Sequence, residues 1–396
     1  MRKALIAVLM LVSSAAHAAT RREIVARVPA EYRDLYALLA SQLNAAEAQI
    51  APLHPELKPQ PVYASDLLPA NGNRGTDLLK PGALEGSKLF LDRFQQLGMR
   101  GVVMTVGYPL LLDRFPNSAQ YLAFYKQVVA EARKRGMTVE MESAVLFANL
   151  PFSTIQWDWS KVPFSQFTQE RHDMVQKIVT ELAPDYLELG AEPDTMGRLT
   201  GYTQMFQPAA FAQHIAQVIA GIDRRSTKLG AGIGTWADLG YVQAEALLPL
   251  DFIGLHIYPI DSASMITAYQ ACNIARAHGK TIVVDEAWLY KMLPGESTDI
   301  AANTVIFARD SFSIFTALDE QFLHFLDGFA RVEGVALVSP FWSTFFFGTL
   351  PYTQENAALS YGALVQKVNG VASANIQRGI FTPLGAYYGA LTAGRR

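Results

Sequence analysis

The sequence predicts an α/β fold, a (β/α)8 TIM barrel with a helical extension at its N-terminus. Short apolar segments with strand character alternate with amphipathic helical segments from residue 59 to the end of the chain. Eight strand-like segments can be counted, which is the number that closes a barrel of this kind. The chain of 396 residues is long for one domain but normal for a barrel with insertions. No internal repeat or low-complexity linker divides residues 59–396, so we expect a single barrel domain there.

The first 18 residues have the layout of a secretory signal peptide. Arg2 and Lys3 precede an apolar run from Ala4 to Val12, and Ala16-His17-Ala18 forms a small-x-small cleavage site. The apolar run is too short to span a membrane, which takes roughly 20 residues, and no later stretch is long and uncharged enough. We therefore expect cleavage after Ala18 and a soluble periplasmic or secreted protein with no membrane span.

The later elements follow from periodicity and from local start and stop signals. Residues 19–58 carry a helical pattern from about Glu31 to Ile50 and a proline-rich exit, which predicts a helix packed on the outside of the barrel. Gly98 is a stop signal before the second strand, and Pro208 is a favoured first residue of a helix. The expected strands cover residues 61–67, 101–106, 137–144, 186–192, 229–234, 252–258, 281–285 and 335–339. The expected helices cover residues 84–97, 118–135, 174–182 after an aromatic loop at 152–167, 208–222, a pair within 300–330, and one or two closing helices.

Charge and composition exclude several classes of function. The formal net charge of −3 becomes −5 once Arg2 and Lys3 are removed, and no run of basic residues marks a nucleic-acid surface. Cys272 is the single cysteine, so no intramolecular disulfide can form. The sequence contains no HxH, HExxH, CxxC or GxSxG pattern, and Thr235 breaks the GxGxxG pattern that begins at Gly230. We expect no cofactor and no resident metal, and the sequence indicates no oligomeric state.

Two glutamates at strand ends are the candidate catalytic residues. The stretch PDYLELGAEPDT places Glu192 at the end of the fourth strand, before Pro193, which is expected to stop the strand and start a loop. The stretch TIVVDEAW repeats this design and places Glu286 at the end of the seventh strand, 94 positions after Glu192. A carboxylate is costly to desolvate, so the alternative interpretation is a strand-end glutamate that points into water. Two carboxylates on separate strands of one sheet suggest an acid and a nucleophile.

Aromatic side chains gather at the same end of the predicted barrel. Barrel active sites form at the C-terminal ends of the strands, and all five tryptophans fall after strands three, five, seven and eight. Aromatic faces around a barrel mouth suit the apolar faces of sugar rings, although packing between loops is an alternative role. The tryptophans are Trp157, Trp159, Trp236, Trp288 and Trp342.

Strand alternation directs several polar groups toward the barrel interior. Asp285 and Glu286 are adjacent in sequence and are expected to point in opposite directions. His256 and Tyr258 share one face of the sixth strand near the mouth, so we predict that both line the site. The other inward positions are Glu140 and Glu142 on strand three and Tyr186, Glu188 and Glu192 on strand four.

The runs LELGAEP and VVDEAW resemble the large clan of retaining β-glycosidases with (β/α)8 barrels, whose acid/base and nucleophile glutamates end strands four and seven. His256-Ile257-Tyr258 is similar to the clan's His-x-Tyr on strand six, whose tyrosine supports the nucleophile. Trp342 matches the tryptophan on strand eight that floors the sugar site. Two departures stand out. Position 191 is Ala where the clan usually has an asparagine that bonds the sugar 2-hydroxyl, and strand two (GVVMTV) lacks an arginine often found there.

The resemblance implies an exported glycoside hydrolase that cleaves a β-linked oligo- or polysaccharide by a retaining double displacement. Glu192 would be the acid/base and Glu286 the nucleophile, and burial together with the charge of Glu286 is expected to raise the pKa of Glu192. One alternative is an inactive carbohydrate-binding barrel, suggested by Ala191 and the missing arginine. Another is a Mg²⁺- or Ca²⁺-dependent barrel hydrolase that uses inward carboxylates at Glu140, Glu142 and Glu188. The predicted substrate-binding residues are Glu142, Trp157, Trp236, His256, Tyr258, Trp288 and Trp342.

Overall fold

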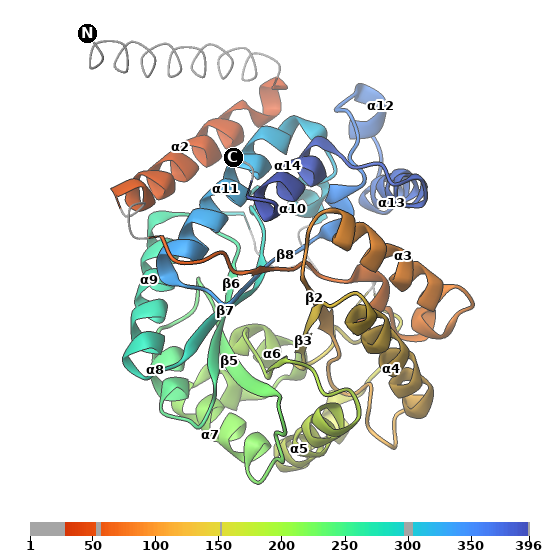
Figure 1. Ribbon diagram of the computed structural model, residues 1–396, viewed down its shortest axis with the longest axis vertical. Helices are drawn as coiled ribbons and strands as arrows, with labels where there is room; N and C mark the ends of the chain where they lie inside the picture. Colours follow the sequence, from red (N-terminus) through yellow and green to blue (C-terminus); the bar gives the residue numbers. More distant parts are fainter. Residues whose placement is uncertain (1–27, 53–56, 151–152, 297–303, 395–396) are drawn as a thin grey trace.

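The computed structural model describes residues 28–52, 57–150, 153–296 and 304–394, and within them the chain forms a (β/α)8 barrel (Figure 1). The eight strands are ordered β1-β8-β7-β6-β5-β4-β3-β2, and every neighbouring pair is parallel. A parallel bridge between Asp66 and Val103 joins the chain after β1 to β2 and completes the ring. The predicted fold class is therefore confirmed. The predicted signal peptide lies outside the described residues.

All eight predicted strands are present, with ends that differ from the prediction by a few residues. They are buried on both faces, as expected for a parallel sheet that has helices outside and side chains filling the inside. The strands are β1 (Val62–Tyr63), β2 (Gly101–Thr105), β3 (Thr138–Glu142), β4 (Tyr186–Glu188), β5 (Lys228–Gly234), β6 (Phe252–Ile257), β7 (Thr281–Ala287) and β8 (Leu337–Pro340).

Helices surround this ring and follow the strands in alternation (Figure 1). The α-helices are α2 (Arg33–Ile50), α3 (Ala83–Gln96), α4 (Ser118–Lys134), α5 (Phe164–Glu181), α6 (Pro193–Thr200), α7 (Pro208–Ile219), α8 (Gly240–Ala246), α9 (Ser262–Ala277), α10 (Thr304–Arg309), α11 (Thr316–Glu333), α12 (Gln354–Ala357), α13 (Tyr361–Arg378) and α14 (Pro383–Thr392). Short 3-10 segments are Ala30–Tyr32, Leu68–Ala70, Gly72–Leu79, Trp159–Lys161, Thr203–Phe206, Ser313–Phe315 and Ser343–Phe346. No helix among the described residues combines the length and the apolar character that a membrane crossing requires.

The predicted N-terminal helix is present as α2, which lies on the outside of the barrel along α11 (Figure 1). Leu35, Leu39, Leu43 and Ile50 recur at helical spacing and are buried, so one apolar face packs on the barrel helices. The division of the chain into a segment 19–58 and a barrel 59–396 remains a prediction.

Three element predictions were wrong. Pro193 does not start a loop, because it is the first residue of α6, where a fixed φ and a missing N–H are tolerated. Phe164 and Phe167 lie in the first turn of α5 and not in the preceding loop. Three helices, α12 to α14, follow β8 where one or two were expected.

A bulge in β7 controls the direction of two acidic side chains. Gly254 of β6 pairs with Val283 of β7, but His256, two residues later, pairs with Glu286, three residues later. The extra residue on β7 is a β-bulge, which breaks strict alternation. Asp285 and Glu286 were expected to point in opposite directions, and this prediction was wrong because both contact His256. The strand also continues past its predicted end at Asp285.

The barrel interior changes from apolar to acidic along the strands. Alternate strand residues form a separate apolar cluster, made of Ala64, Val103, Tyr186, Phe252, Val283 and Leu337. The strands also carry the acidic residues Glu140, Glu188 and Asp285, and these three side chains are almost completely buried. Gly254 makes room for one of them, because a Cβ at this position would lie 2.8 Å from Oδ2 of Asp285.

Candidate active site

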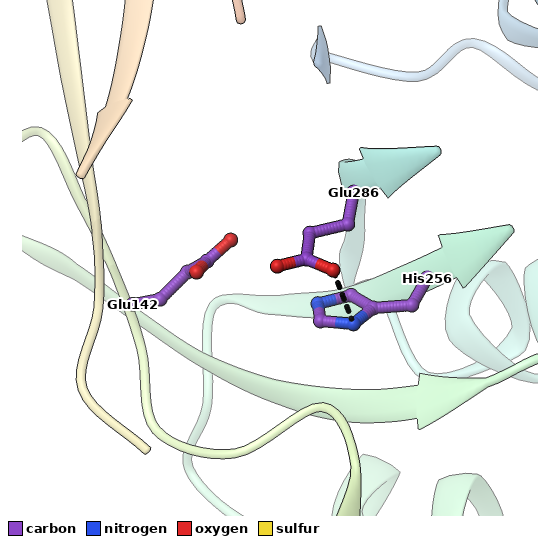
Figure 2. A group of neighbouring side chains, drawn as sticks. All are labelled: Glu142, His256 and Glu286. Atoms are coloured by element: carbon purple, nitrogen blue, oxygen red, sulfur yellow. Dashed lines mark ion pairs between the residues drawn. The ribbon is translucent and has the colours of Figure 1, made fainter. Parts of the chain in front are cut away.

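The C-terminal ends of strands β3, β4, β6 and β7 bring four titratable side chains together, which are Glu142, Glu192, His256 and Glu286. Figure 2 shows three of them, Glu142, His256 and Glu286. The imidazole Nδ1 lies 2.9 Å from Oε1 of Glu192 and 3.3 Å from Oε2 of Glu286. Its Nε2 lies 3.6 Å from Oδ1 of Asp285. A single buried imidazole therefore contacts both candidate catalytic glutamates and the carboxylate beneath them.

The separation of the two glutamates is limited by these contacts. Both distances start from the same nitrogen, so the nearest oxygens of Glu192 and Glu286 lie no further apart than 2.9 plus 3.3 Å, or about 6.2 Å. Glu192 precedes α6 as its N-cap residue, and its side chain is one-fifth exposed. Both side chains reach the mouth, where a substrate could touch them.

Tyr258 supports Glu286 from the neighbouring strand end. Its hydroxyl donates a hydrogen bond to Oε2 of Glu286. The ring of Tyr258 packs against Tyr290, with centroids 4.7 Å apart, and against Trp236 at 6.0 Å. The phenol is therefore held by rings on two sides, which fixes its hydroxyl on the carboxylate.

Glu142 is the third carboxylate of this group. Its Oε2 accepts a hydrogen bond of 3.0 Å from the hydroxyl of Thr105, which in turn accepts one of 3.2 Å from the amide of Asn71. One ligand atom from each of Glu142, His256 and Glu286 can be chosen so that all three lie within 4.8 Å of one another. Figure 2 shows the Glu142 side chain reaching toward Glu286 from the opposite side of the barrel.

The site sets the proton affinities of its groups in opposite directions. Burial raises the pKa of Glu286 to about 7, and the charge of Glu192 adds to this, while His256 and the Tyr258 hydroxyl oppose it. Burial would also raise the pKa of Glu192, but the hydrogen bond and charge of His256 hold it below its usual value. The expectation of a raised pKa at Glu192 was wrong for the free protein, because His256 donates to this carboxylate.

His256 itself keeps its proton. Burial alone would lower the pKa of the imidazole, but the charges of Glu286 and Asp285 and the hydrogen bond to Glu192 raise it well above its usual value. In the free protein these shifts favour an imidazolium at His256 in contact with a carboxylate at Glu192. Proton donor and acceptor are 2.9 Å apart, close enough for the proton to move between them.

The inner carboxyl groups form a separate layer. Burial raises the pKa of Glu188 to about 8 and that of Asp285 to about 6, and it raises the pKa of Glu140 well above its usual value. The set proposed from the sequence for a metal, Glu140, Glu142 and Glu188, does not come together as a ligand group. Within the described part of the chain, the acidic and histidine side chains with ligand atoms this close are Glu142, His256 and Glu286.

Two of the predicted tryptophans lie near this group. Trp236 is 39% exposed, and its indole N–H donates a 3.3 Å hydrogen bond to Asp194. Asp194 lies in the first turn of α6, two positions after Glu192. Trp342 is half-buried and adopts a left-handed backbone conformation with φ of 51°, which is unusual for a bulky residue. Its ring packs against Phe341, which also contacts Tyr258.

The other predicted tryptophans lie elsewhere. Trp288 is 1% exposed, and its indole N–H donates a 2.8 Å hydrogen bond to Asp310, so this ring is covered by protein. Trp157 packs against Tyr108 and carries the Arg114 guanidinium 4.6 Å above its ring. Together with Trp157, Arg114, Asn149, Gln156, Asp158, Lys161 and Val162 line a cavity of about 470 Å³. Glu142, Glu192, His256 and Glu286 do not line that cavity.

Sequence reasoning missed several groups around the mouth. Asp66 follows β1, accepts a 2.9 Å hydrogen bond from the backbone N–H of Ser343, and has a pKa raised to about 7 by burial. The strand-end rule that found Glu192 would have found Asp66 and Thr105 as well. Lys291 is fully buried and donates to Asp310 at 2.5 Å and to Asp319 at 2.6 Å, and this ionic group anchors the chain after β7. Its residues are too far apart in sequence to form a recognisable pattern.

The sequence of this chain matches neither a known family profile nor a curated protein. Its fold, by contrast, recurs in solved structures. GH5_18 from Streptomyces cattleya, solved with GlcNAc, has a TM-score of 0.53 at 13% identity over 86% of this chain and 80% of that one. A β-glucosidase from Thermotoga maritima, solved with deoxynojirimycin, has a TM-score of 0.52 at 12% identity over 86% of this chain and 99% of that one.

A third similar structure is the exo-β-1,4-mannosidase Op5Man5 from Opitutaceae bacterium strain TAV5. It has a TM-score of 0.52 at 14% identity over 85% of this chain and 60% of that one. At such identities the likeness shows a common fold, and it agrees with the (β/α)8 architecture to which the sequence resemblance pointed. The fold and the site together define this chain as a (β/α)8 barrel with paired carboxylates at its C-terminal mouth.

Proposed function

We propose that this protein is an exported glycoside hydrolase that cleaves β-linked glycosides with retention of configuration. The observation that carries the proposal is the pairing of Glu192 and Glu286 around His256, with nearest oxygens within about 6.2 Å. Retaining enzymes hold their carboxyl groups ~5–5.5 Å apart, whereas inverting enzymes leave ~6.5–9.5 Å for a water. A limit of about 6.2 Å between nearest oxygens is compatible with the retaining arrangement, which the sequence resemblance also implies.

In the first step Glu286 attacks the anomeric carbon and the leaving oxygen takes a proton from Glu192. Glu192 is ionised in the free protein, so that proton comes along the 2.9 Å contact from the imidazolium of His256. The glycosyl–Glu286 ester and the neutral imidazole remain. In the second step Glu192 takes a proton from water, the hydroxyl attacks the anomeric carbon, and Glu286 leaves as a carboxylate.

The groups around the pair keep each glutamate in its role. Tyr258 donates to Oε2 of Glu286, which stabilises the ionised nucleophile and leaves the other oxygen to attack. Trp236 is exposed and packs against Tyr258, so its ring would contact the sugar. Tyr258 follows β6 and Trp236 follows β5, so both side chains are held by strand ends, which are rigid supports for a site.

The similar solved structures support a β-glycoside as the substrate class. They include a β-glucosidase and an exo-β-1,4-mannosidase. Export rests on the signal-like layout of residues 1–18 and agrees with a substrate found outside the cell.

The test is turnover of aryl β-glycosides and β-linked polysaccharides, with the first-formed anomer read by proton NMR. A β-anomer as the first product supports retention, and an α-anomer contradicts it. Glu286→Ala should lose turnover, and azide should restore turnover of an activated aryl β-glycoside by displacing the phenol from the face that Glu286 occupied, giving the α-glycosyl azide. An active Glu286→Ala variant without azide would end the proposal.

Two further outcomes identify the alternatives. Oligosaccharide binding without turnover would indicate the carbohydrate-binding barrel. Loss of turnover in a chelator, restored by Mg²⁺ or Ca²⁺, would indicate the metal-dependent hydrolase. The Glu286→Gln variant serves as the matched control in both assays, since it keeps the shape of the side chain and removes its charge.

A further inference from the structure

Glu142 has an oxygen atom that no described residue satisfies. Its side chain is 5% exposed, and its Oε2 is held by the Thr105 hydroxyl, which Asn71 holds in turn. Its Oε1 is buried and has no hydrogen-bond partner among the described residues. A buried acceptor without a donor is costly, so this fixed oxygen favours a ligand that brings a donor.

The position of Glu142 says which part of a sugar would meet it. Ligand atoms of Glu142, His256 and Glu286 lie within 4.8 Å of one another, and Figure 2 shows Glu142 reaching toward Glu286. In the proposed reaction Glu286 lies against the anomeric carbon. The substituent on the adjacent carbon, C2, is the ring substituent nearest to the nucleophile, so it is the one that Glu142 can reach.

The charges at the mouth favour a cationic substituent over a neutral one. Three carboxyl groups, from Glu142, Glu192 and Glu286, share a single imidazolium. Burial and the charge of Glu286 raise the pKa of Glu142 well above its usual value, and the charge of His256 opposes this, so a second cation beside Glu142 would further favour its ionised form. Ala191, beside Glu192, brings no polar side chain that could bind C2 from the other side.

We propose that the substrate is a 2-amino-2-deoxy-β-glycoside whose ammonium group binds Oε1 of Glu142. This inference rests on the proposed function and adds the substrate class to it. An ammonium next to Oε1 of Glu142 would stabilise the ionised form of this carboxyl group and give the oxygen a charge-assisted hydrogen bond. A 2-hydroxyl or a 2-acetamido group can donate a hydrogen bond but carries no charge.

The kinetic test uses matched pairs of 4-nitrophenyl β-glycosides in the gluco, galacto and manno series. Each pair carries a 2-amino or a 2-hydroxyl group, and a third member carries a 2-acetamido group. Below the amine's pKa, the wild-type protein should prefer the 2-amino member of its best series by tenfold or more in kcat/KM. Glu142→Gln should reduce that preference at least tenfold. A wild-type preference for the hydroxyl or acetamido member would overturn the proposal.

A binding test keeps the inference separate from catalysis. Calorimetry on the Glu192→Gln variant would compare the β-1,4-linked trimer of glucosamine with cellotriose. Tighter binding of the glucosamine trimer, lost when Glu142→Gln is added, supports the inference even if no glycoside is turned over, in which case the proposed function alone fails. Equal binding of both trimers, or binding of neither, would overturn it.

A matched control tests for a general effect of negative charge. Asp194 is another carboxylate close to Glu192, but it is already paired with Arg198 at 2.9 Å and with Trp236. Asp194→Asn should keep the preference for the amine. If it loses the preference as Glu142→Gln does, then long-range charge accounts for the effect and the assignment to Glu142 is wrong.

Discussion

The hydroxyl of Tyr258 donates a hydrogen bond to the carboxylate of Glu286, 28 positions further along the chain and on the neighbouring strand end. The β7 bulge makes this contact geometrically possible, since it sets Glu286 opposite His256 and directs its carboxylate to the interior. The sequence resemblance implied the same pairing. It offers the most direct way to change the proton affinity of Glu286 without removing the side chain.

Tyr258→Phe should move the acidic limb of the pH–activity profile upward. The Tyr258 hydrogen bond lowers the pKa of Glu286, which burial has raised to about 7, so its loss raises that pKa further. Activity needs ionised Glu286 and should therefore appear at higher pH. Hydrogen bonds to charged groups contribute ~1.5–3 kcal/mol, so kcat/KM near neutrality should fall by about 10- to 150-fold. Tyr290→Phe, which preserves the ring beside Tyr258, is the control, and an equal shift in that variant would contradict the assignment.

Glu192→Ala should slow substrates with poor leaving groups far more than those with good ones. Only a poor leaving group needs the proton that Glu192 delivers. His256→Ala should show the same trend in weaker form, because Glu192 loses the imidazolium that supplies its proton in the free protein. The measurement is kcat/KM across aryl glycosides of graded phenol pKa. A uniform loss across the series would remove Glu192 from the acid role.

Stability should fall as pH rises, and Glu188 should contribute to that slope. Its folded pKa of about 8 exceeds the ordinary glutamate pKa, so its protonated form is favoured in the native state. The stability it supports is complete below the unfolded pKa and is lost as pH rises to about 8. Each such group changes the unfolding free energy by ~1.4 kcal/mol per pH unit in this window.

Glu188→Gln should flatten this dependence and gain stability relative to wild type as pH increases. Urea denaturation at pH 5, 6.5 and 8 would be the measurement. Glu85→Gln, at a side chain that is 72% exposed, is the control and should leave the slope unchanged. If the difference in unfolding free energy between Glu188→Gln and wild type is the same at all three pH values, Glu188 does not hold a proton in the folded protein.

Trp342→Ala should weaken turnover more than it weakens folding. A stacking contact between a tryptophan ring and a bound sugar is commonly worth ~1–3 kcal/mol, or about 5- to 150-fold in kcat/KM. Trp288→Ala is the contrasting variant, because this ring is buried and hydrogen-bonded to Asp310. It should lose ~3–5 kcal/mol of stability. Unchanged kinetics in Trp342→Ala would place that ring in loop packing.

The exported protein should begin at Ala19. Ala16-His17-Ala18 is the small-x-small site that follows the apolar run, so N-terminal sequencing of material from the periplasm or medium should read Ala-Thr-Arg. A protein that begins at Met1, or one that is found only in the cytoplasm, would contradict this prediction and the proposal of export.

The sequence was sufficient for the fold, because eight strands and their helices each carry a local periodic signal. It was also sufficient to name Glu142, His256, Tyr258 and Glu286, which the structure brings together. It failed where an extra residue in β7 changes the direction of a side chain, as at Asp285. It also failed where a pKa depends on a neighbour in space, as with Glu192, whose pKa is lowered by His256. Sequence spacing also gave no indication that Trp288 would turn to Asp310 and be covered.

The β7 bulge has a consequence for how this site can change during evolution. Point substitutions in β7 leave the count of residues between Val283 and Glu286 intact, so the direction of the acidic side chain survives them. Deletion of one residue between Val283 and Glu286 restores regular alternation, so that Glu286 shares the inward face of Val283 and no second acidic residue beside it faces the interior. The inward direction of two successive acidic residues is thus robust to replacement and lost on deletion of a single codon. Homologous chains that drift in sequence but keep this spacing inherit the orientation unchanged.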